Sequence, residues 1–271
     1  MSFLRYMSIS SFRKHNPDWE INLVRINKHQ GKSWKTSEQA DDDIDGTLYE
    51  DLLPRLKRLG VQIVNYPEDY GDIGVPNASI VHTKDLLMWH ILAEYGGVSA
   101  DMDIAFCGPV ERCLPEADVA FSCYDFYGHY KPVSFMASTG NQFFRDVFEE
   151  AKRRYNPHVY ESCGAGCLPA GPMEPISRHW QDSVSVARLP TAGVFPFINP
   201  GQGQATFDKY HAHAFCRDSS DLLSPETCGV HWYAGSPMGY KMNNLITESN
   251  VFTHDNTVCN IVKNVLEKDN A

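Results

Sequence analysis

Along the first part of the chain, the spacing of hydrophobic residues predicts a helix, a strand, a second helix and a second strand. Apolar residues at helical spacing lie within Leu4–Arg13, and Pro17 then disfavours further helix. β-Branched residues are enriched in Glu20–Ile26, which we interpret as a strand. Tyr49–Leu59 has leucines at helical spacing and ends at a glycine, and Val61–Val64 resumes as a strand. This alternation favours a β-α-β arrangement, which is typical of α/β folds.

The central part of the chain has the strongest signal for a buried helix. Thr83–Tyr95 is rich in apolar residues. Thr83 is the expected N-cap of this helix, and two glycines follow directly after its end. Val98–Phe106 and Asp118–Cys123 then have the composition of strands. A helix that stops on two glycines and leads into a strand predicts a tight connection between the two.

The second half of the chain predicts a short strand, two amphipathic helices and two long loops. We expect a strand at Val133–Ala137 and helices at Asn141–Tyr155 and Thr257–Lys268. Glycine and proline are frequent in Glu161–Pro175 and Ala192–Gly203, which we interpret as loops around a site. Because no internal repeat or low-complexity segment appears, we expect one domain covering residues 1–271.

The composition is that of a globular protein, and it narrows the class of partners. Of the 271 residues, 42% are hydrophobic and 21% charged, which is enough apolar material to bury a core. Lys and Arg number 24 against 34 Asp and Glu, so the net charge is −10. This balance argues against a broad basic surface for nucleic acid. A phosphate-bearing ligand would then be bound locally, through a metal ion.

Targeting and redox features point to the cytoplasm. No run approaches the roughly 18 apolar residues of a membrane span, and the first residues lack the layout of a signal peptide. The eight cysteines include no Cys-x-x-Cys pair, so we interpret them as reduced thiols. We therefore expect a cytoplasmic protein without a transmembrane segment.

The sharpest candidate for chemistry is the pair Asp101 and Asp103, which follows the two glycines. Residues two apart on a regular strand share a face, so both carboxylates would project the same way. Two adjacent carboxylates favour a divalent cation, whose coordination shell phosphate oxygens can complete. The plainer interpretation is an exposed acidic strand end that binds nothing.

The run that contains this pair resembles the signature of a known enzyme family. Thr83–Asp103 is similar to the signature of the DXD-containing sugar-binding-region glycosyltransferases, which include capsular-polysaccharide transferases and Golgi α-mannosyl and α-galactosyl transferases. Four further segments resemble family segments in the same order: Ser11–Glu20 the segment before its second strand, Ala170–Pro172 its Thr-Gly-Pro turn, Val194–Phe197 its Phe-x-Pro strand, and Val230–Ser236 its His-x-Trp-x-x-Ser motif. This shared order is more specific than any single segment.

The resemblance implies a GT-A fold, a Rossmann-like α/β sheet that binds a nucleotide-diphosphate sugar. The implied activity is retaining transfer of the sugar from a UDP- or GDP-sugar to a hydroxyl of a glycan or other acceptor, as in polysaccharide biosynthesis, with Mn²⁺ or Mg²⁺ as cofactor. About 1–137 would form the nucleotide-sugar-binding core, 138–256 the acceptor side and 257–268 a closing helix. Peripheral association with a membrane is compatible with acceptors that are built there.

The same resemblance implies roles for individual residues. The expected metal ligands are Asp101, Asp103 and His231, and the expected catalytic residues are Asp103 and Asp125. The expected substrate contacts are Lys84, Asp85, Gly97, Asp101, Gly171, Pro172, Ser236 and Lys241. Plainer interpretations exist for two of them. A lone histidine such as His231 is more often a packed or solvated residue, and a carboxylate such as Asp85 in the first turn of a helix is favoured by the helix dipole alone.

The sequence departs from the family pattern in two places. Met88 stands where the family has an arginine, so one contact is missing or is supplied elsewhere, with Lys84 as the candidate. The family's first strand, of the type Ile-Pro-Lys-Ile-Ile-His, has no counterpart because Met1 is almost at the following helix. We therefore expect a fold without that strand, in which either the start is truncated or the nucleotide base is held differently. A degenerate, non-catalytic sugar-binding module stays open as an alternative.

Other interpretations are less favoured. The Asp-x-Asp strand also resembles the nucleophile strand of haloacid-dehalogenase-type phosphatases. His211, His213 and Cys216 are zinc-ligand types without a regularly spaced fourth ligand. The acidic stretch 41–45 lacks the Gly and Glu of a calcium loop, so we interpret it as solvated.

Overall fold

The structure is a computed structural model that describes residues 1–26, 52–67, 73, 75, 78–123, 132–140, 142–159, 162–164, 185–198 and 207–269. Its described helices are α1 (Phe3–His15), α3 (Leu53–Arg58), α4 (Ile80–Glu94), α5 (Gln142–Arg154), α7 (Thr191–Val194), α8 (Phe207–His211), α9 (Pro237–Leu245) and α10 (Thr257–Asp269). Short 3-10 turns lie at Val110–Arg112, Ser220–Leu222 and Val251–Thr253, and a π-helical turn lies at Ala212–Cys216.

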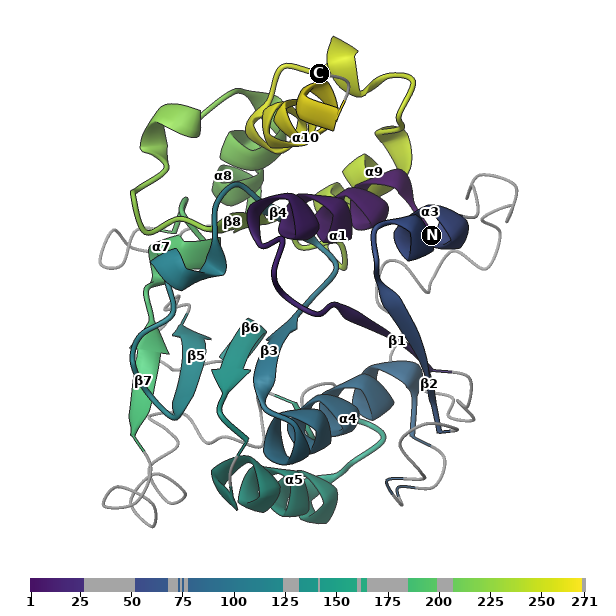
Figure 1. Ribbon diagram of the computed structural model, residues 1–271, viewed down its shortest axis with the longest axis vertical. Helices are drawn as coiled ribbons and strands as arrows, with labels where there is room; N and C mark the ends of the chain where they lie inside the picture. The colour runs from purple at the N-terminus through teal and green to yellow at the C-terminus, as the bar shows by residue number, and fades with distance from the viewer. Residues whose placement is uncertain are drawn as a thin grey trace.

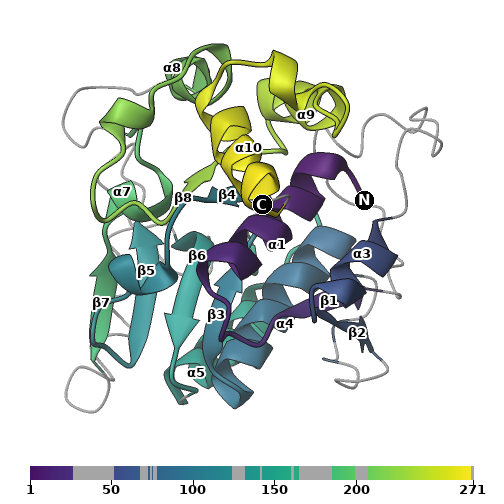
Figure 2. The ribbon, with the colours of Figure 1, turned by 45° about the horizontal axis from the view of Figure 1, so that its top comes forward.

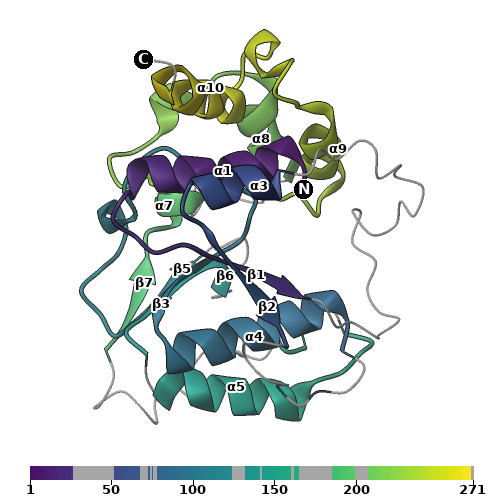
Figure 3. The same cartoon turned by 45° about the vertical axis from the view of Figure 1, so that its right-hand side comes forward.

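The described strands form three small sheets, and helices lie above and below the group of sheets (Figures 1 and 3). The strands are β1 (Asn22–Ile26), β2 (Gln62–Tyr66), β3 (Gly97–Ala100), β4 (Ile104–Phe106), β5 (Val119–Cys123), β6 (Pro132–Ser138), β7 (Val186–Leu189) and β8 (Gly229–His231). A four-stranded sheet has the order β3-β6-β5-β7, with antiparallel pairs except for the parallel pair β5 and β7. The fold is therefore mixed α/β.

The predicted β-α-β arrangement is present near the N-terminus. β1 pairs in parallel with β2, with Asn22 opposite Gln62, and α3 lies between them in the chain. Gly60 has a φ of 75°, a left-handed conformation that glycine adopts at little cost, so it ends α3 and turns the chain into β2.

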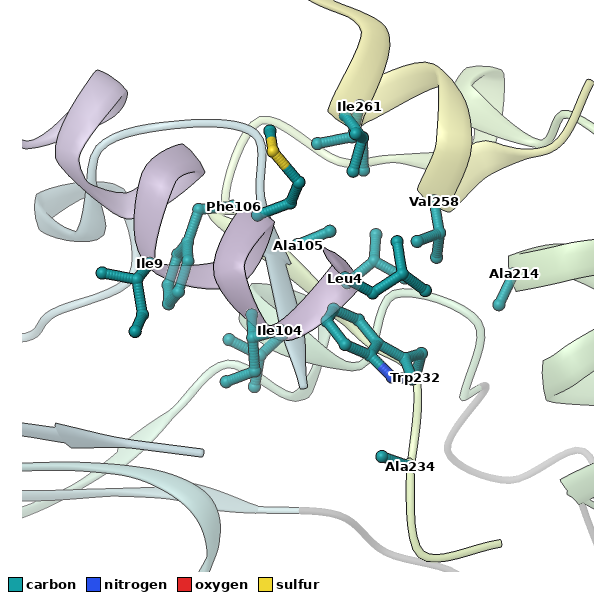
Figure 4. Close-up of a cluster of buried hydrophobic side chains, with 14 of the residues drawn as sticks. Leu4, Ile9, Ile104, Ala105, Phe106, Ala214, Trp232, Ala234, Val258 and Ile261 are labelled. Carbon is teal, nitrogen blue, oxygen red and sulfur yellow. The ribbon is translucent and has the colours of Figure 1, made fainter. Parts of the chain in front are cut away.

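Two hydrophobic clusters hold the elements together. The larger one surrounds the third sheet, in which β4 pairs antiparallel with β8. Figure 4 shows Leu4 and Ile9 of α1, Ile104 and Phe106 of β4, Trp232, and Val258 and Ile261 of α10 in this cluster. Figure 2 shows α10 beside α1. The short β4–β8 pair is thus enclosed by helices from the two ends of the chain.

Side-chain hydrogen bonds fix α1 against β4. Ser11 Oγ accepts a hydrogen bond from the N–H of Phe106 at 3.0 Å and donates to the carbonyl oxygen of Ser8 at 2.9 Å. Asn16 Oδ1 accepts from the N–H of Val110 at 2.9 Å. Because these polar groups are buried, each pairing removes a desolvation cost of about 1–3 kcal/mol that an unmade hydrogen bond would carry.

The smaller cluster joins α4 to α5, which lie side by side in Figures 1 and 3. Its fully buried members include Trp89, Phe143 and Phe144, and the rings of Trp89 and Phe144 are stacked at 5.8 Å. Met88 packs against the same cluster, so the residue at the family's arginine position serves packing here. This cluster fixes the backbone of α4 on which Lys84 and Asp85 stand.

Most predicted elements are present with boundaries shifted by a few residues. Four predictions were wrong in detail: the N-cap of α4, the place of Asp85 in its first turn, the continuous strand Val98–Phe106 and the strand Val194–Phe197. The N-cap of α4 is Ser79 instead of Thr83, because Ser79 Oγ accepts from the N–H of His82 at 3.2 Å. The helix therefore begins one turn earlier, and Asp85 lies beyond its first turn. The predicted strand Val98–Phe106 is interrupted between β3 and β4.

The fourth wrong detail is the predicted strand Val194–Phe197. The structure has the short helix α7 ending at Val194, followed by a turn. The N–H of Phe195 donates to the carbonyl oxygen of Thr191 at 2.8 Å, which closes this helical turn.

The side chains of six cysteines are described, and all six are free thiols. The sulfur atoms of Cys113 and Cys228 lie 3.0 Å apart in the core. None of the described helices combines the length and the apolar character that a membrane crossing requires.

Candidate active site and metal centre

The site lies where the chain leaves one sheet and enters another. β3 pairs with β6, whereas β4 pairs with β8, and the connection between β3 and β4 contains Asp101 and Asp103. The two aspartates therefore do not share the face of one regular strand, which was the geometry expected from their spacing. They nevertheless converge with His231, and the ligand atoms of the three side chains lie within 4.8 Å of one another.

Asp103 is held by the segment that follows β8. Its Oδ2 accepts a hydrogen bond from the N–H of Ala234 at 2.7 Å, and its carbonyl oxygen accepts from the N–H of Trp232 at 2.9 Å. Burial would raise the pKa of this carboxyl group, but the adjacent His231 imidazole and the Ala234 N–H outweigh burial and lower the pKa of Asp103 to about 2. Asp103 is therefore an anion at neutral pH.

His231 reaches Asp103 because of strand register. His231 lies opposite Ile104 in the β4–β8 pair, and Ile104 directly follows Asp103 in the chain. His231 is buried, with 3% of its surface exposed. Its Nε2 is 3.0 Å from Asp103 Oδ1, yet the contact is not aligned as a hydrogen bond, and neither ring nitrogen has a hydrogen-bond partner among the described residues.

This unaligned contact fits the donor set of a divalent cation. Adjacent ligands of an octahedral ion at about 2.1 Å lie about 3 Å apart, which is the separation of the Nε2 and Oδ1 atoms. A buried nitrogen without a partner is costly unless something in the site satisfies it. Two carboxylates and an imidazole suit Mn²⁺ or Mg²⁺, so the residues present fit the cofactor that the sequence predicts.

Asp101 faces a different neighbour. Its Oδ1 lies 2.7 Å from Lys84 Nζ, which is also 3.6 Å from Asp85 Oδ1. The Lys84 side chain is 42% exposed, so solvent screens these ion pairs. Partial burial opposes its charge, but the carboxylates of Asp101 and Asp85 raise the pKa of Lys84 above its ordinary value. Three residues predicted to contact substrate thus form one charged cluster.

Asp85 packs against a glycine that sequence reasoning missed. A Cβ atom added at Gly164 would lie 2.3 Å from Asp85 Oδ2, so a larger residue there would require the Asp85 carboxylate to shift. The segment that contains Gly164 is fixed to α4 because Trp89 Nε1 donates to the carbonyl oxygen of Cys163 at 2.7 Å. The sequence signal was the glycine-rich composition around this position, which marked a loop without naming the residue.

The turn after β8 is strained and tightly packed. Tyr233 has a φ of 53°, a left-handed conformation that non-glycine residues rarely adopt and that often marks a functional site. The ring of Tyr233 meets that of His231 edge to face at 4.2 Å. A Cβ atom at Gly239 would lie 2.0 Å from the Tyr233 carbonyl oxygen, so this glycine allows α9 to approach the turn.

Ser236 serves this turn with its hydroxyl group. Its Oγ caps α9 by accepting from the N–H of Gly239 at 3.1 Å, and it donates to the carbonyl oxygen of Tyr233 at 2.7 Å. His211 Nε2 is 3.2 Å from the same hydroxyl and 3.2 Å from the Trp232 carbonyl oxygen. These partners explain Ser236 structurally, and its predicted contact with substrate stays a prediction.

Other predicted residues are not members of the three-residue cluster or lie outside the described residues. Gly97 begins β3 with a φ of 91°, and Lys241 is exposed on α9. Asp125, Gly171 and Pro172 lie outside the described residues. His211 and His213 make internal contacts, and within the described part of the chain the three-residue group at Asp101 is the candidate metal cluster that the structure contains.

Tyr210 is a further residue near the site that the sequence did not indicate. Its ring is fully buried and meets the Tyr233 ring at 5.2 Å, and its hydroxyl group has no hydrogen-bond partner among the described residues. Burial first, and the negative charge of Asp103 second, raise the pKa of Tyr210 well above its ordinary value, so the phenol stays neutral. The Tyr210 hydroxyl group is thus a neutral hydrogen-bond donor close enough to the Asp103 carboxylate to be affected by its charge.

Comparison with known proteins adds no assignment to this geometry. No protein-family model matches the sequence, and no curated protein matches it.

Proposed function

We propose that this protein is a metal-dependent retaining glycosyltransferase of the GT-A type, acting in the cytoplasm. Its donor would be a UDP- or GDP-sugar, and its acceptor a hydroxyl group of a glycan or another molecule. The observation that supports this proposal best is the meeting of Asp101 and Asp103 with His231, which is buried and lacks a hydrogen-bond partner. These are the residues for which the family resemblance implies metal binding.

Asp101, Asp103 and His231 would hold Mn²⁺ or Mg²⁺, which offsets the charge that builds on the leaving diphosphate. Asp103 is already placed for this role because the N–H of Ala234 holds its Oδ2 while its Oδ1 faces His231. Fixing a ligand before the cation arrives reduces the reorganisation needed on binding.

The remaining steps need little further acid or base chemistry. Asp85 would bind hydroxyl groups of the donor sugar, as the family resemblance implies, and Gly164 sets where its carboxylate can lie. The acceptor proton can pass to the leaving phosphate, so no strong general base is required. Lys241 and Asp125 are proposed to assist the leaving group and the anomeric centre, respectively.

The phosphatase alternative has less support from the site. A carboxylate nucleophile must be accessible to phosphorus, whereas Asp101 is paired with Lys84 at 2.7 Å. Asp103 Oδ2 accepts a hydrogen bond from the N–H of Ala234, and its Oδ1 lies 3.0 Å from the buried His231 ring. A non-catalytic sugar-binding module would have the same site as a transferase and would differ from it only in lacking turnover.

The test is calorimetric titration of the protein with UDP and with GDP, with and without Mn²⁺, for the wild type and Asp103→Asn. Asparagine keeps an oxygen that can accept from the Ala234 N–H but removes the charge. We expect Mn²⁺-dependent binding of one nucleotide that the variant loses. If neither nucleotide binds, the proposal is wrong.

Turnover separates the remaining alternatives. Slow Mn²⁺-dependent hydrolysis of a UDP- or GDP-sugar without acceptor would support the transferase. Binding without hydrolysis or transfer would indicate the non-catalytic module. Hydrolysis of a simple phosphate monoester, lost in Asp101→Asn, would indicate the phosphatase instead.

A further inference from the structure

Lys84 places a positive charge against one of the three candidate metal ligands. Its ammonium group lies 2.7 Å from Oδ1 of Asp101, whose carboxylate a divalent cation in this site would use. An ammonium ion and a metal ion cannot share that oxygen without repelling each other. Cation binding through the Asp101 carboxylate therefore competes with the ammonium group and is favoured when that group moves away.

The surroundings of Lys84 allow that movement. The backbone of α4 is fixed by the buried neighbours Thr83 and Leu86, whereas the Lys84 side chain is 42% exposed on a flexible four-carbon stem. Asp85 Oδ1, 3.6 Å from the ammonium group, keeps it near the site after Asp101 is lost as a partner. A displaced ammonium group thus stays within the cluster.

A lysine ammonium group released beside a metal ion is suited to an anionic ligand of that metal. It is a compact, strongly hydrated charge with three donors, and it binds phosphate oxygens well. The diphosphate of a nucleotide would bring such oxygens to the metal. The ion pair lost with Asp101 can then be replaced by one with phosphate.

We propose that Lys84 couples the binding of the divalent cation to the binding of the nucleotide diphosphate by exchanging Asp101 for a phosphate oxygen. This inference rests on the proposed function because it uses the same metal site. The cation alone binds against the competition of Lys84, and the diphosphate relieves that competition. By thermodynamic linkage, the cation must then strengthen diphosphate binding by the same factor.

A purely structural role for Lys84 predicts the opposite effect on metal affinity. If the lysine only held Asp101 in position, its removal would loosen a metal ligand and weaken cation binding. If it competes with the cation, its removal strengthens binding of the cation alone. The sign of the change therefore distinguishes the two roles.

The experiment measures Mn²⁺ binding by electron paramagnetic resonance of free Mn²⁺, with no nucleotide and with saturating UDP or GDP. Lys84→Met removes the charge and keeps the length of the stem, and Lys84→Gln is a second variant of the same kind. Lys84→Arg retains the charge. Lys57→Met removes an exposed lysine of α3 as the matched control. Circular dichroism and thermal unfolding verify that each variant is folded.

Without nucleotide, we expect Lys84→Met and Lys84→Gln to bind Mn²⁺ up to about fivefold more tightly than the wild type, the factor that corresponds to a partly exposed ion pair. We also expect the tightening of Mn²⁺ by the nucleotide to fall by at least the same factor. Lys84→Arg and Lys57→Met should resemble the wild type.

Two results would overturn the inference, and they differ in whether the proposed metal site is also wrong. If the wild type binds Mn²⁺ but Lys84→Met and Lys84→Gln bind it equally or more weakly, Lys84 does not compete, and the proposed metal site stands. If the wild type shows no saturable Mn²⁺ binding under any condition, the metal site itself is wrong and the coupling falls with it.

Discussion

The two sides of the candidate site differ in how their charged groups are held. On the β8 side, Asp103 and His231 lie among buried residues. The N–H of Ala234 donates to the Asp103 carboxylate, and the N–H of Trp232 donates to the Asp103 carbonyl oxygen. On the α4 side, Asp101 and Asp85 form ion pairs with a half-exposed Lys84. Directed hydrogen bonds in a core preorganise a ligand, whereas solvent-screened ion pairs can exchange partners.

This difference suggests a division of labour within one site. The β8 side would provide a fixed half of the proposed metal centre, and the α4 side would provide groups that respond to what binds. Substitutions on the fixed side should therefore affect stability and metal binding together. Substitutions on the α4 side should change affinities and leave the fold intact.

The largest effect is expected for His231→Ala. The variant loses a buried residue that we propose as a metal ligand, so we expect Mn²⁺ affinity to fall by at least about 100-fold and donor turnover to fall with it. The estimate follows because removal of even outer-shell partners costs about 10–100-fold. Mn²⁺ titration and donor hydrolysis measure the two losses. His254→Ala, at a partly exposed histidine before α10, is the control. Unchanged Mn²⁺ affinity in His231→Ala would show that β8 supplies no ligand.

The next effect tests whether the turn after β8 builds the fixed side. A methyl group at Gly239 would lie 2.0 Å from the Tyr233 carbonyl oxygen, a backbone atom that cannot rotate away. We expect Gly239→Ala to lower the free energy of unfolding by about 3 kcal/mol, at the upper end for overpacking, and to weaken Mn²⁺ binding as the turn shifts.

Gly235→Ala is the matched control for that substitution. Gly235 lies in the same turn, and a Cβ atom there has nothing within 4 Å. We expect a change in unfolding free energy below about 0.5 kcal/mol in urea denaturation. Equal destabilisation by both substitutions would contradict the close approach of α9 to Tyr233.

Acid should weaken the fixed side through Asp103. Its pKa is lowered to about 2 in the folded protein, against about 3.9 for an unfolded chain, so ionised Asp103 stabilises the fold above pH 4. That contribution, about 2 kcal/mol, is lost as the pH falls from about 4 towards 2. We measure it as the difference in unfolding free energy between wild type and Asp103→Asn, with EDTA present. A difference that stays constant from pH 5 to pH 2.5 would contradict the lowered pKa.

The sequence predicted the elements whose pattern is local. The apolar stripe of Asn141–Tyr155 and that of Thr257–Lys268 correspond to α5 and α10, because helical periodicity alone marks the buried face. The strand predicted after Gly96 and Gly97 could not be treated in the same way. Whether Val98–Phe106 forms one strand or two depends on pairing with β6 and with β8, which are distant in the chain.

The site was predictable in its side chains and not in its backbone contacts. Carboxylates and a histidine can be recognised as ligand types wherever they stand in a sequence. The Ala234 N–H that holds Asp103 has no side-chain signature, and neither does the space that Gly164 leaves for Asp85. Lys84 was predictable in part. Met88, at the position of the family's arginine, pointed to Lys84 as the substitute, but nothing in the sequence indicated that Lys84 pairs with Asp101.

The smallest predicted effect concerns the start of α4 and tests whether the α4 side is independent of its cap. Ser79 Oγ accepts from the N–H of His82 at 3.2 Å and also contacts His82 Nδ1 at 3.1 Å. Because Ser79→Ala removes this cap, we expect it to lower the free energy of unfolding by about 1 kcal/mol. Mn²⁺ affinity should stay within about twofold of the wild type, since packing against α5 fixes the helix at Lys84 and Asp85. Urea denaturation and Mn²⁺ titration of the same variant measure both. Loss of Mn²⁺ affinity with so small a loss of stability would mean that the α4 side depends on the exact start of its helix. The contrast between a fixed β8 side and a responsive α4 side would then be wrong.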